Sequence, residues 1–264
     1  MRRNYTDCME FTLKYEGGYS SVRSDPGNWT GGKVGAGVLK GTKFGISAKA
    51  YPNLDIKNLT IDQAKTIYEK SYWLPVKGDD LPSGVDLSVF DAGVMSGPSH
   101  GVKWLQKALG VSQDGIVGPK TLAAFKGKDV VKIIKAVCAN RQGFVESLKT
   151  FITFGKGWTS RIAACEAASL RLYLSSNVDT KPITKDTLQE EADTASKTAD
   201  RQNTGAIGAS GGGGVSTFAI SDQVAHWLTI GLLVAILGLV IYLVWRAHVN
   251  TERAAAFENE AAKV

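Results

Sequence analysis

The sequence predicts a mainly helical α+β protein, in which a helical domain carries a small β-hairpin and is followed by a single transmembrane helix. Three observations lead to this fold class. Apolar residues recur at helical spacing through most of residues 5–174. The stretch 19–47 lacks that spacing and is rich in Gly, Ser and Thr, so we expect the hairpin there. Residues 224–245 form an apolar run of membrane-spanning length.

Local signals mark where helices begin and end. The stripe that starts at Tyr5 and Met9 belongs to a helix that should end near Glu16, where two glycines follow. Thr60 and Gln63 have the spacing of a capping box, which predicts a helix running to about residue 72. Further helices are expected at about 85–94, 102–109, from Pro119, at 129–152 and at 158–174.

We expect five segments along the chain: a first lobe at 1–96, a second helical lobe at 97–174, a flexible linker at 175–221, a transmembrane helix at 222–246 and a short tail at 247–264. The linker is assigned because polar residues alternate there without apolar periodicity and end in a glycine-rich run. As a random coil it would reach about 35–40 Å from the membrane.

The apolar run 224–245 has the length and composition of a membrane span. Apart from His226 it contains no side chain that is charged near neutral pH, and it is about 33 Å long, against about 30 Å for a bilayer core. Trp227 and Trp245 would lie at the two interfaces. A buried core helix is the alternative, but the run is apolar all round. We therefore expect a single-pass membrane protein.

Two arguments about the orientation of the span disagree. Arg246 and Arg253 follow the run and no Lys or Arg closely precedes it, so the positive-inside rule places the tail in the cytoplasm and the head outside. The first residues, however, lack the apolar core of a secretory signal. A large head without a signal is hard to export, which favours the inner side. The orientation stays open.

Basic residues exceed acidic ones only in residues 1–175, which carry 24 Lys and Arg against 15 Asp and Glu. We therefore expect an acidic partner, such as nucleic acid, anionic lipid or a bacterial wall polymer. No basic cluster, zinc-finger spacing or RNA-binding signature favours nucleic acid. The scattered histidines and three separate cysteines indicate no metal site, and we expect neither a metal nor an organic cofactor.

Glu16 is the strongest candidate for acid chemistry. It follows the apolar face of a helix, where a low dielectric favours a protonated carboxyl, and the two glycines after it leave room for a ligand. Such a group could protonate the leaving oxygen of a glycosidic bond, with Asp25 as a second carboxylate. On spacing alone, a surface glutamate at a helix end and an ordinary Asp-Pro-Gly turn remain the simpler interpretations.

Motif order strengthens the catalytic interpretation. The motifs are Glu16-Gly-Gly-Tyr19, Asp25-Pro-Gly27, Thr42-x-x-Gly45-Ile46 and, later, Asp114-Gly-x-x-Gly118-Pro119. Their order resembles family 108 of the glycoside hydrolases, lysozyme-like bacterial and phage N-acetylmuramidases, over about residues 5–174. The resemblance implies that Glu16 is the general acid. Asp25 would steady the positive charge at the anomeric carbon or orient water, and Thr42 would help to hold that water.

The resemblance also implies partners for each part of the chain. Residues 1–96 would be a muramidase lobe and residues 97–174 a peptidoglycan-binding lobe, both acting on glycan strands. The lipid bilayer would hold residues 224–245, and membrane-protein or virion partners are possible. Such a chain suits phage lysis or penetration of a cell wall, and it would lie in a bacterial inner membrane or in the internal membrane of a virion.

The chain departs from the family pattern at two places. About a dozen extra residues, 28–41, separate Asp25 from Thr42, which makes these two assignments weaker than that of Glu16 and makes Thr30 a rival to Thr42. Met95 stands where family members often carry Asn, so a polar contact in the cleft is expected to be missing.

Three aromatic residues are candidates for binding sugar rings: Tyr19, Trp29 and Trp73. A core position for Trp73, which precedes Leu74 and Pro75, is an equally good interpretation. For the whole protein two alternatives to hydrolysis stay open. One is lytic transglycosylase chemistry, in which the muramyl 6-hydroxyl replaces water, and the other is a membrane-anchored peptidoglycan-binding or envelope-assembly protein without activity.

Overall fold

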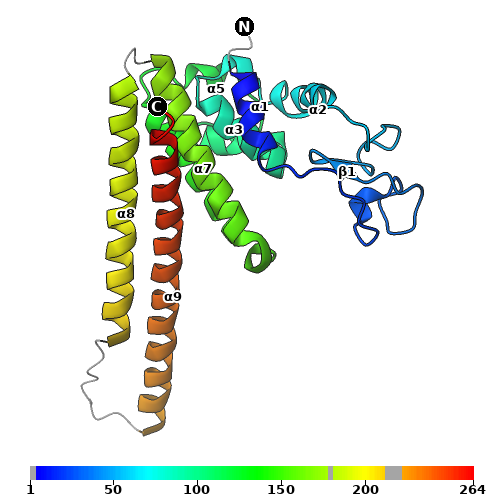
Figure 1. Cartoon of the computed structure of the whole chain (residues 1–264). Helices are drawn as coiled ribbons and strands as arrows, with labels where there is room; N and C mark the ends of the chain where they lie inside the picture. Colours follow the sequence, from blue (N-terminus) through cyan, green and yellow to red (C-terminus); the bar gives the residue numbers. More distant parts are fainter. Residues whose placement is uncertain (1–3, 178–180, 212–221) are drawn as a thin grey trace. The chain divides into compact units, whose positions relative to one another are not determined.

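The computed structural model describes residues 4–177, 181–211 and 222–264. Most of these residues are helical, and they contain one two-stranded hairpin, which confirms the predicted fold class (Figure 1). The chain divides into two compact units, Met1–Phe144 and Val145–Val264.

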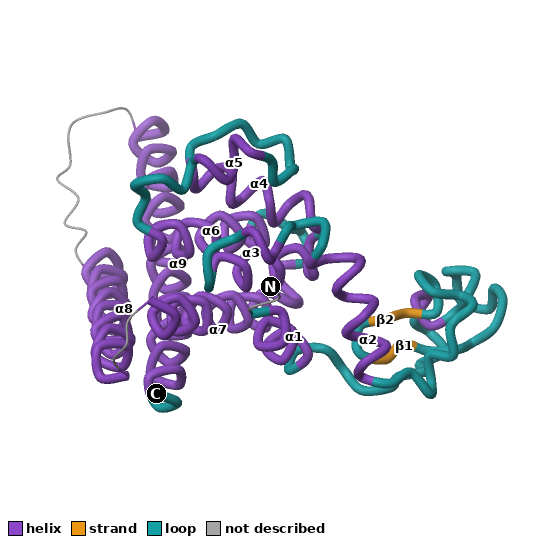
Figure 2. Tube along the Cα trace, turned by 90° about the horizontal axis from the view of Figure 1, so that it is seen from above, coloured by secondary structure: helices purple, strands orange, loops and turns teal. Residues whose placement is uncertain are grey.

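The first unit combines short helices with a loop-rich region that contains the hairpin. Its elements are α1 (Tyr5–Leu13), η1 (Pro26–Asn28), β1 (Thr42–Lys43), β2 (Ile46–Ser47), α2 (Ile61–Tyr68), η2 (Glu69–Trp73), η3 (Gly78–Asp80), α3 (Val85–Ser96), α4 (Pro98–Leu109), α5 (Pro119–Ala123) and most of α6 (Val130–Glu146). Figure 2 shows the hairpin among loop segments beside α2. The capping box forms as predicted, with Thr60 and Gln63 each accepting from the other's backbone N–H.

Helix α3 is the centre of the first unit, and α1 and α4 pack against it. Every residue from Val85 to Gly93 is buried, including the polar residues Asp86, Ser88 and Asp91. The rings of Tyr5 from α1, Trp73 from η2 and Phe90 of α3 pack against one another, with centroids 5.2–6.1 Å apart. This aromatic cluster joins the beginning of the chain to the helices that follow the hairpin.

A buried ion pair joins α3 to α6 inside this core. The Asp91 carboxylate lies 2.8 Å from the Arg141 guanidinium, and neither side chain is more than 1% exposed. The Thr12 hydroxyl donates to the same carboxylate, so Asp91 has the partners that a buried carboxylate requires. Arg141 also donates to the Met95 sulfur, while its Nε and Nη1 have no hydrogen-bond partner among the described residues. Because sulfur is a weak acceptor, the Arg141 guanidinium has fewer strong hydrogen bonds than its buried position requires.

The second unit contains three long helices, α7 (Phe151–Asn177), α8 (Lys181–Gly211) and α9 (Asp222–Ala261), and the end of α6. The prediction of a flexible linker at 175–221 is wrong for most of its length, because α8 occupies 181–211; residues 212–221 lie outside the described residues. Helix α8 packs along α9 (Figure 1). Most of the buried side chains of α8 are alanines. Because alanine is small and only weakly apolar, its spacing was not recognised as the apolar stripe of a helix.

The predicted apolar run lies within α9, which continues without interruption to residue 261. Among the described residues, one helical segment is long and apolar enough to cross a membrane, Ile230–Ala261 of α9. Large apolar side chains between Ile230 and Val244 are exposed, unlike those of a core helix.

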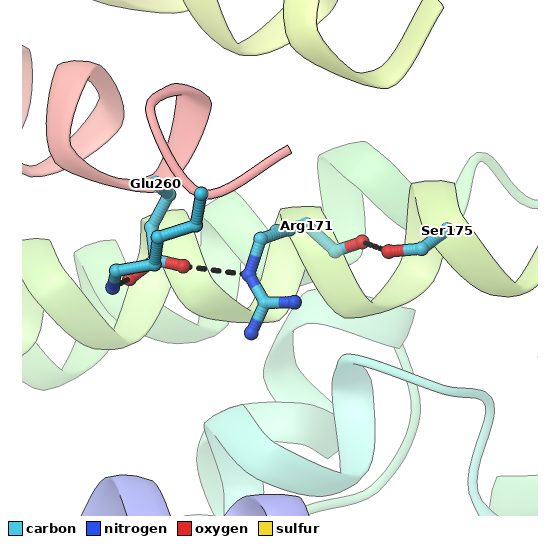
Figure 3. Close-up of polar contacts among 4 residues, drawn as sticks. Arg171, Ser175 and Glu260 are labelled. Atoms are coloured by element: carbon cyan, nitrogen blue, oxygen red, sulfur yellow. Dashed lines mark hydrogen bonds and ion pairs between the residues drawn. The ribbon is translucent and has the colours of Figure 1, made fainter. Parts of the chain in front are cut away.

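Ion pairs tie the part of α9 after the apolar run to α7. Arg253 makes two hydrogen bonds with the Glu166 carboxylate, at 2.6 and 3.1 Å, and Arg171 lies 2.6 Å from Glu260 (Figure 3). The carboxylate side chains are only 5% and 8% exposed, so losing either arginine would leave a largely buried charge.

The buried carboxyl of Asp86 generates a prediction about stability and pH. Asp86 accepts from Asn4 and from two backbone N–H groups, but burial is the larger effect and raises its pKa to about 6. The folded protein therefore holds this proton more tightly than the unfolded chain, so the contribution is present below about pH 4 and is lost as the pH rises through 6. Asp86→Asn should gain on the order of 1–3 kcal/mol of unfolding free energy relative to wild type between pH 4 and pH 7. Urea unfolding at several pH values measures this difference.

The matched control for that measurement is Asp80→Asn, which removes the same charge from an exposed position. Its stability difference from wild type should stay nearly constant over the same pH range. Parallel pH curves for wild type and Asp86→Asn would contradict the prediction.

The buried Asp91–Arg141 pair generates a second prediction. Arg141→Leu leaves the Asp91 carboxylate buried without its cation and should lower the free energy of unfolding by about 3–5 kcal/mol. The double variant Arg141→Leu/Asp91→Leu removes both charges and should recover much of that loss. Chemical denaturation of the two variants tests the pair, and a double variant no more stable than the single one would argue against it.

Candidate active site

Glu16 follows α1 and is held by backbone pairing on both sides. Its N–H donates to the Leu13 carbonyl at 3.2 Å, and its side chain is half-buried. Just beyond it, the Gly17 carbonyl accepts from Phe44, and Ser20 exchanges two backbone hydrogen bonds of 2.8 Å with Thr42. The segment after Glu16 is thus a neighbour of the hairpin strand β1. This pairing brings the first and third predicted motifs together.

The hairpin turn lies against the Glu16 carboxyl. Phe44 and Gly45 connect β1 to β2 and have φ of 51° and 71°, the two positive values typical of the tight hairpin turn that suits the strand twist. A Cβ atom on Gly45 would stand 2.5 Å from Glu16 Oε2, so only glycine allows this approach. Phe44 has a left-handed conformation that is uncommon for a bulky residue, and such residues often mark functional sites.

Tyrosines that the sequence analysis did not select surround the same turn. The Tyr68 hydroxyl donates to the Phe44 carbonyl at 2.9 Å and lies, like Glu16 Oε2, 2.5 Å from the Cβ position of Gly45. These two oxygens are therefore no more than 5.0 Å apart. Burial raises the pKa of Tyr72, and the nearby Tyr51 and Glu16 add to this effect, so Tyr72 remains a neutral phenol. The only signal in the sequence was the four-residue spacing of Tyr68 and Tyr72 on one helix face.

Asn28 ties the segment of Asp25 to that of Thr42, across the insertion. Its side-chain oxygen accepts from the Thr42 hydroxyl at 2.7 Å, and its backbone carbonyl accepts from Lys40 and Gly41. Asn28 is fully buried, whereas Asp25 is exposed and caps η1 by accepting from the Gly27 N–H. The extra residues 28–41 therefore form a loop whose two ends meet at Asn28. Sequence reasoning missed Asn28, because nothing around it predicts its long-range partner.

The inserted residues fold back on themselves as an arm. Trp29 bridges to Leu39, and the Thr30 N–H and hydroxyl both bond to Val38 across the arm. Thr30, the alternative to Thr42 in the sequence, thus pairs the two sides of the inserted arm. Its hydroxyl accepts from Val38, whereas the Thr42 hydroxyl donates to Asn28.

Two of the predicted sugar-binding aromatics lie in this loop region. Tyr19 is 41% exposed and its ring packs against Gly41. It lines a shallow hollow of about 300 Å³ together with Leu39, Lys40, Asn53, Asp55, Ile56 and Lys57. Asp55 remains ionised there, because hydrogen bonds from Asn58 lower its pKa. Trp29 is half-buried, and its indole N–H donates to the Arg23 carbonyl at 2.8 Å.

Trp73 does not belong to the candidate site. It is 1% exposed and packs between Tyr5 and Phe90, while Gly78 lies directly against its ring. The prediction that Trp73 binds sugar is therefore corrected: its ring has no face available for a ligand. Its position after a helix with apolar neighbours was the signal for a core residue.

The loop that contains Asp114 is organised by a buried glutamine of α4. Gln106 is 1% exposed, donates to the Asp114 carboxylate at 2.6 Å and accepts from the Gly115 N–H at 2.9 Å. The hydrogen bond from Gln106 and one from the Ile116 N–H lower the pKa of Asp114. Asp114 thus shapes the loop.

Comparisons with known proteins match both lobes. The family described as glycosyl hydrolase 108 matches residues 9–97, and the one described as predicted peptidoglycan domain matches residues 100–163. Among solved structures, SagA of Brucella abortus is similar, with 37% sequence identity and a TM-score of 0.56 over 66% of this chain and 97% of that chain. A comparison with curated proteins gives no match.

The helical fold and the two matched domains define a lysozyme-like hydrolase with a peptidoglycan-binding half. The chain belongs to the glycosyl hydrolase 108 family. It is a glycoside hydrolase that acts on peptidoglycan.

The turn beside Glu16 generates a prediction for Tyr68. Tyr68→Phe removes the hydrogen bond to the carbonyl of the strained Phe44, and should lower kcat about fivefold with little change in KM, because the loss of one neutral hydrogen bond costs about 1 kcal/mol. Kinetics on purified peptidoglycan measure both constants. Tyr51→Phe is the matched control, since it also removes one hydroxyl contact, to Ser71, but does not touch the turn. Equal effects of the two variants would contradict a role specific to the turn.

Proposed function

We propose that this protein is an N-acetylmuramidase that hydrolyses the β-1,4 bond between N-acetylmuramic acid and N-acetylglucosamine, with Glu16 as the general acid. The observation that carries the proposal is the approach of Gly45, a residue that lacks a side chain, to the Glu16 carboxyl. A sugar chain reaching that carboxyl would meet backbone and tyrosine hydroxyls, which suit a polar, uncharged ligand. The glycoside hydrolase family of residues 9–97 supports an acid at this place.

Asp25 and Thr42 are proposed to assist on the water side of the reaction. The Asn28 contacts hold Thr42 close to the segment of Asp25, which is the arrangement required for a shared water molecule. Asp25 is exposed and uses one carboxylate oxygen as a helix cap, so its other oxygen can accept from water or steady a developing positive charge. Tyr19 and Trp29 are proposed to bind glycan rings beside the hollow near Tyr19.

The apolar part of α9 is proposed to anchor the enzyme to a lipid bilayer. Its large side chains are exposed from Ile230 to Val244, and burying them in acyl chains removes that apolar surface from water. A peptidoglycan hydrolase attached to a membrane suits phage lysis, or wall penetration by a virion that contains a membrane. In both cases the membrane anchor would hold the enzyme close to the peptidoglycan.

The test of the catalytic proposal is Glu16→Gln in the full-length chain. Removing the general acid should reduce the release of soluble peptidoglycan fragments by at least about 100-fold. Glu10→Gln is the matched control, because it makes the same substitution at an exposed position of α1 and should retain activity. If Glu16→Gln and Glu10→Gln are equally active, Glu16 is not the acid.

Mass analysis of the released fragments tests the reaction itself. Reducing muramic acid ends are expected for a muramidase. Fragments with 1,6-anhydro ends would instead indicate a transglycosylase, and reducing glucosamine ends would indicate cleavage of the other glycosidic bond. Binding to peptidoglycan without any fragment would indicate an inactive binding protein.

A further inference from the structure

The shallow hollow beside Tyr19 is formed by two further segments of the chain. One is the end of the insertion 28–41, which contributes Lys40, and the other is the loop 53–57. Ile56 lines the hollow and is fully buried, so its side chain anchors the loop in the core. The extra residues of the insertion therefore supply one wall of this hollow.

The hollow adjoins the candidate active site through Tyr19. This residue follows Glu16 by three positions, so the two Cα atoms are at most about 11 Å apart. The Tyr19 ring packs against Gly41, where a Cβ atom would stand 2.7 Å from Tyr19 Cε2. Gly41 directly precedes Thr42 of β1. A substituent on a sugar ring bound near Glu16 is therefore within reach of the hollow.

Positive charge is concentrated around the hollow. Residues 28–60 contain five lysines and one acidic residue, Asp55. Two of the lysines, Lys40 and Lys57, line the hollow together with Asp55. Hydrogen bonds from Asn58 hold the pKa of Asp55 below its ordinary value, so this carboxylate stays ionised. The three charges leave one positive charge in excess, which favours a ligand that carries a carboxylate.

Lys40 is held in position and still has donors for a ligand. Its ammonium group donates to the Pro52 carbonyl at 2.7 Å, its side chain is half-buried, and the charge of Asp55 attracts it. An ammonium group has three N–H donors, so two are left for a ligand. A side chain that is already fixed loses less conformational entropy when a ligand binds.

Lys57 supplies the second cation from the loop 53–57. Its backbone carbonyl accepts from the Lys43 ammonium at 3.1 Å, while its own side chain is exposed. The same Lys43 ammonium lies 5.3 Å from the centroid of the Phe44 ring. The Lys43 side chain thus joins β1 to the loop, whereas the Lys57 ammonium is available to a ligand.

The substrate proposed above carries carboxylates close to the bond that is cleaved. N-acetylmuramic acid has a lactyl group, to which a short peptide stem with free carboxylates is attached. We propose that the hollow is a subsite for this peptide stem, in which Lys40 and Lys57 bind a stem carboxylate and the Tyr19 ring borders the subsite toward the sugar. The proposal rests on the N-acetylmuramidase activity proposed above and names the part of the substrate that the insertion recognises.

Binding of soluble glycan strands to the full-length Glu16→Gln protein tests the subsite without turnover. Strands with native stems should have a Kd about tenfold lower than strands whose stem carboxylates have been converted to amides, as expected for roughly one hydrogen bond between charged groups. Adding Lys40→Met and Lys57→Met should bring the two Kd values within about twofold. Lys57→Met alone should already reduce the ratio, and it leaves the bond from Lys40 to Pro52 in place.

The matched control is Lys33→Met, which removes the same charge from an exposed position of the insertion that does not line the hollow. It should retain the full difference between native and amidated strands. Equal affinity of the Glu16→Gln protein for both strands would overturn the subsite, as would a loss in Lys33→Met as large as in Lys57→Met. Strands without stems that bind as tightly as native ones would also overturn it, because they keep only the lactyl carboxylate.

Activity assays separate this inference from the proposed function. The wild type should have a kcat/KM about tenfold higher on native than on amidated strands, and Lys40→Met/Lys57→Met should lose this preference while still releasing reducing muramic acid ends. If neither kind of strand yields such ends, the muramidase proposal is wrong, while the binding ratio still tests the subsite. Equal cleavage and equal binding of both strands would show that only the subsite is wrong.

Discussion

The approach of the Phe44-Gly45 turn to the Glu16 carboxyl is the contact on which the candidate active site depends. It requires a residue without a side chain at position 45, since a Cβ would collide with both Glu16 and Tyr68. It also requires Phe44 to keep a positive φ, which costs free energy that the surrounding structure must offset. Two hydrogen bonds hold the turn, one from Phe44 to Gly17 and one from Tyr68 to Phe44. A strained turn fixed in this way keeps the carboxyl in one geometry, which catalysis by a positioned acid requires.

The insertion between Asp25 and Thr42 is tolerated because its two ends meet at one buried residue. Asn28 accepts hydrogen bonds at its backbone carbonyl and at its side chain from residues on the far side of the insertion. The conformational cost of a longer loop grows slowly with length, so extra residues that return to the same anchor need little compensation. The distance in sequence between Asp25 and Thr42 is therefore a poor guide to their distance in space.

Local chemistry made much of the fold predictable, and long-range packing explains what was missed. The capping box at Thr60 and the helix that ends before Glu16 depend on neighbours within a few residues, and both form as expected. Tyr68 and Asn28 owe their roles to partners 24 and 14 residues away, which no local pattern specifies. The linker prediction failed because hydropathy assigns little weight to alanine. The interval of three and four residues between the buried alanines of α8, and its match in α9, was the available signal.

Helix α8 also changes how the proposed membrane anchor would act on the enzyme. A flexible tether would let the catalytic domain search a volume whose radius grows with the square root of the linker length. A helix of 31 residues that packs along its neighbour has a fixed length, about 46 Å, and cannot vary its reach in this way.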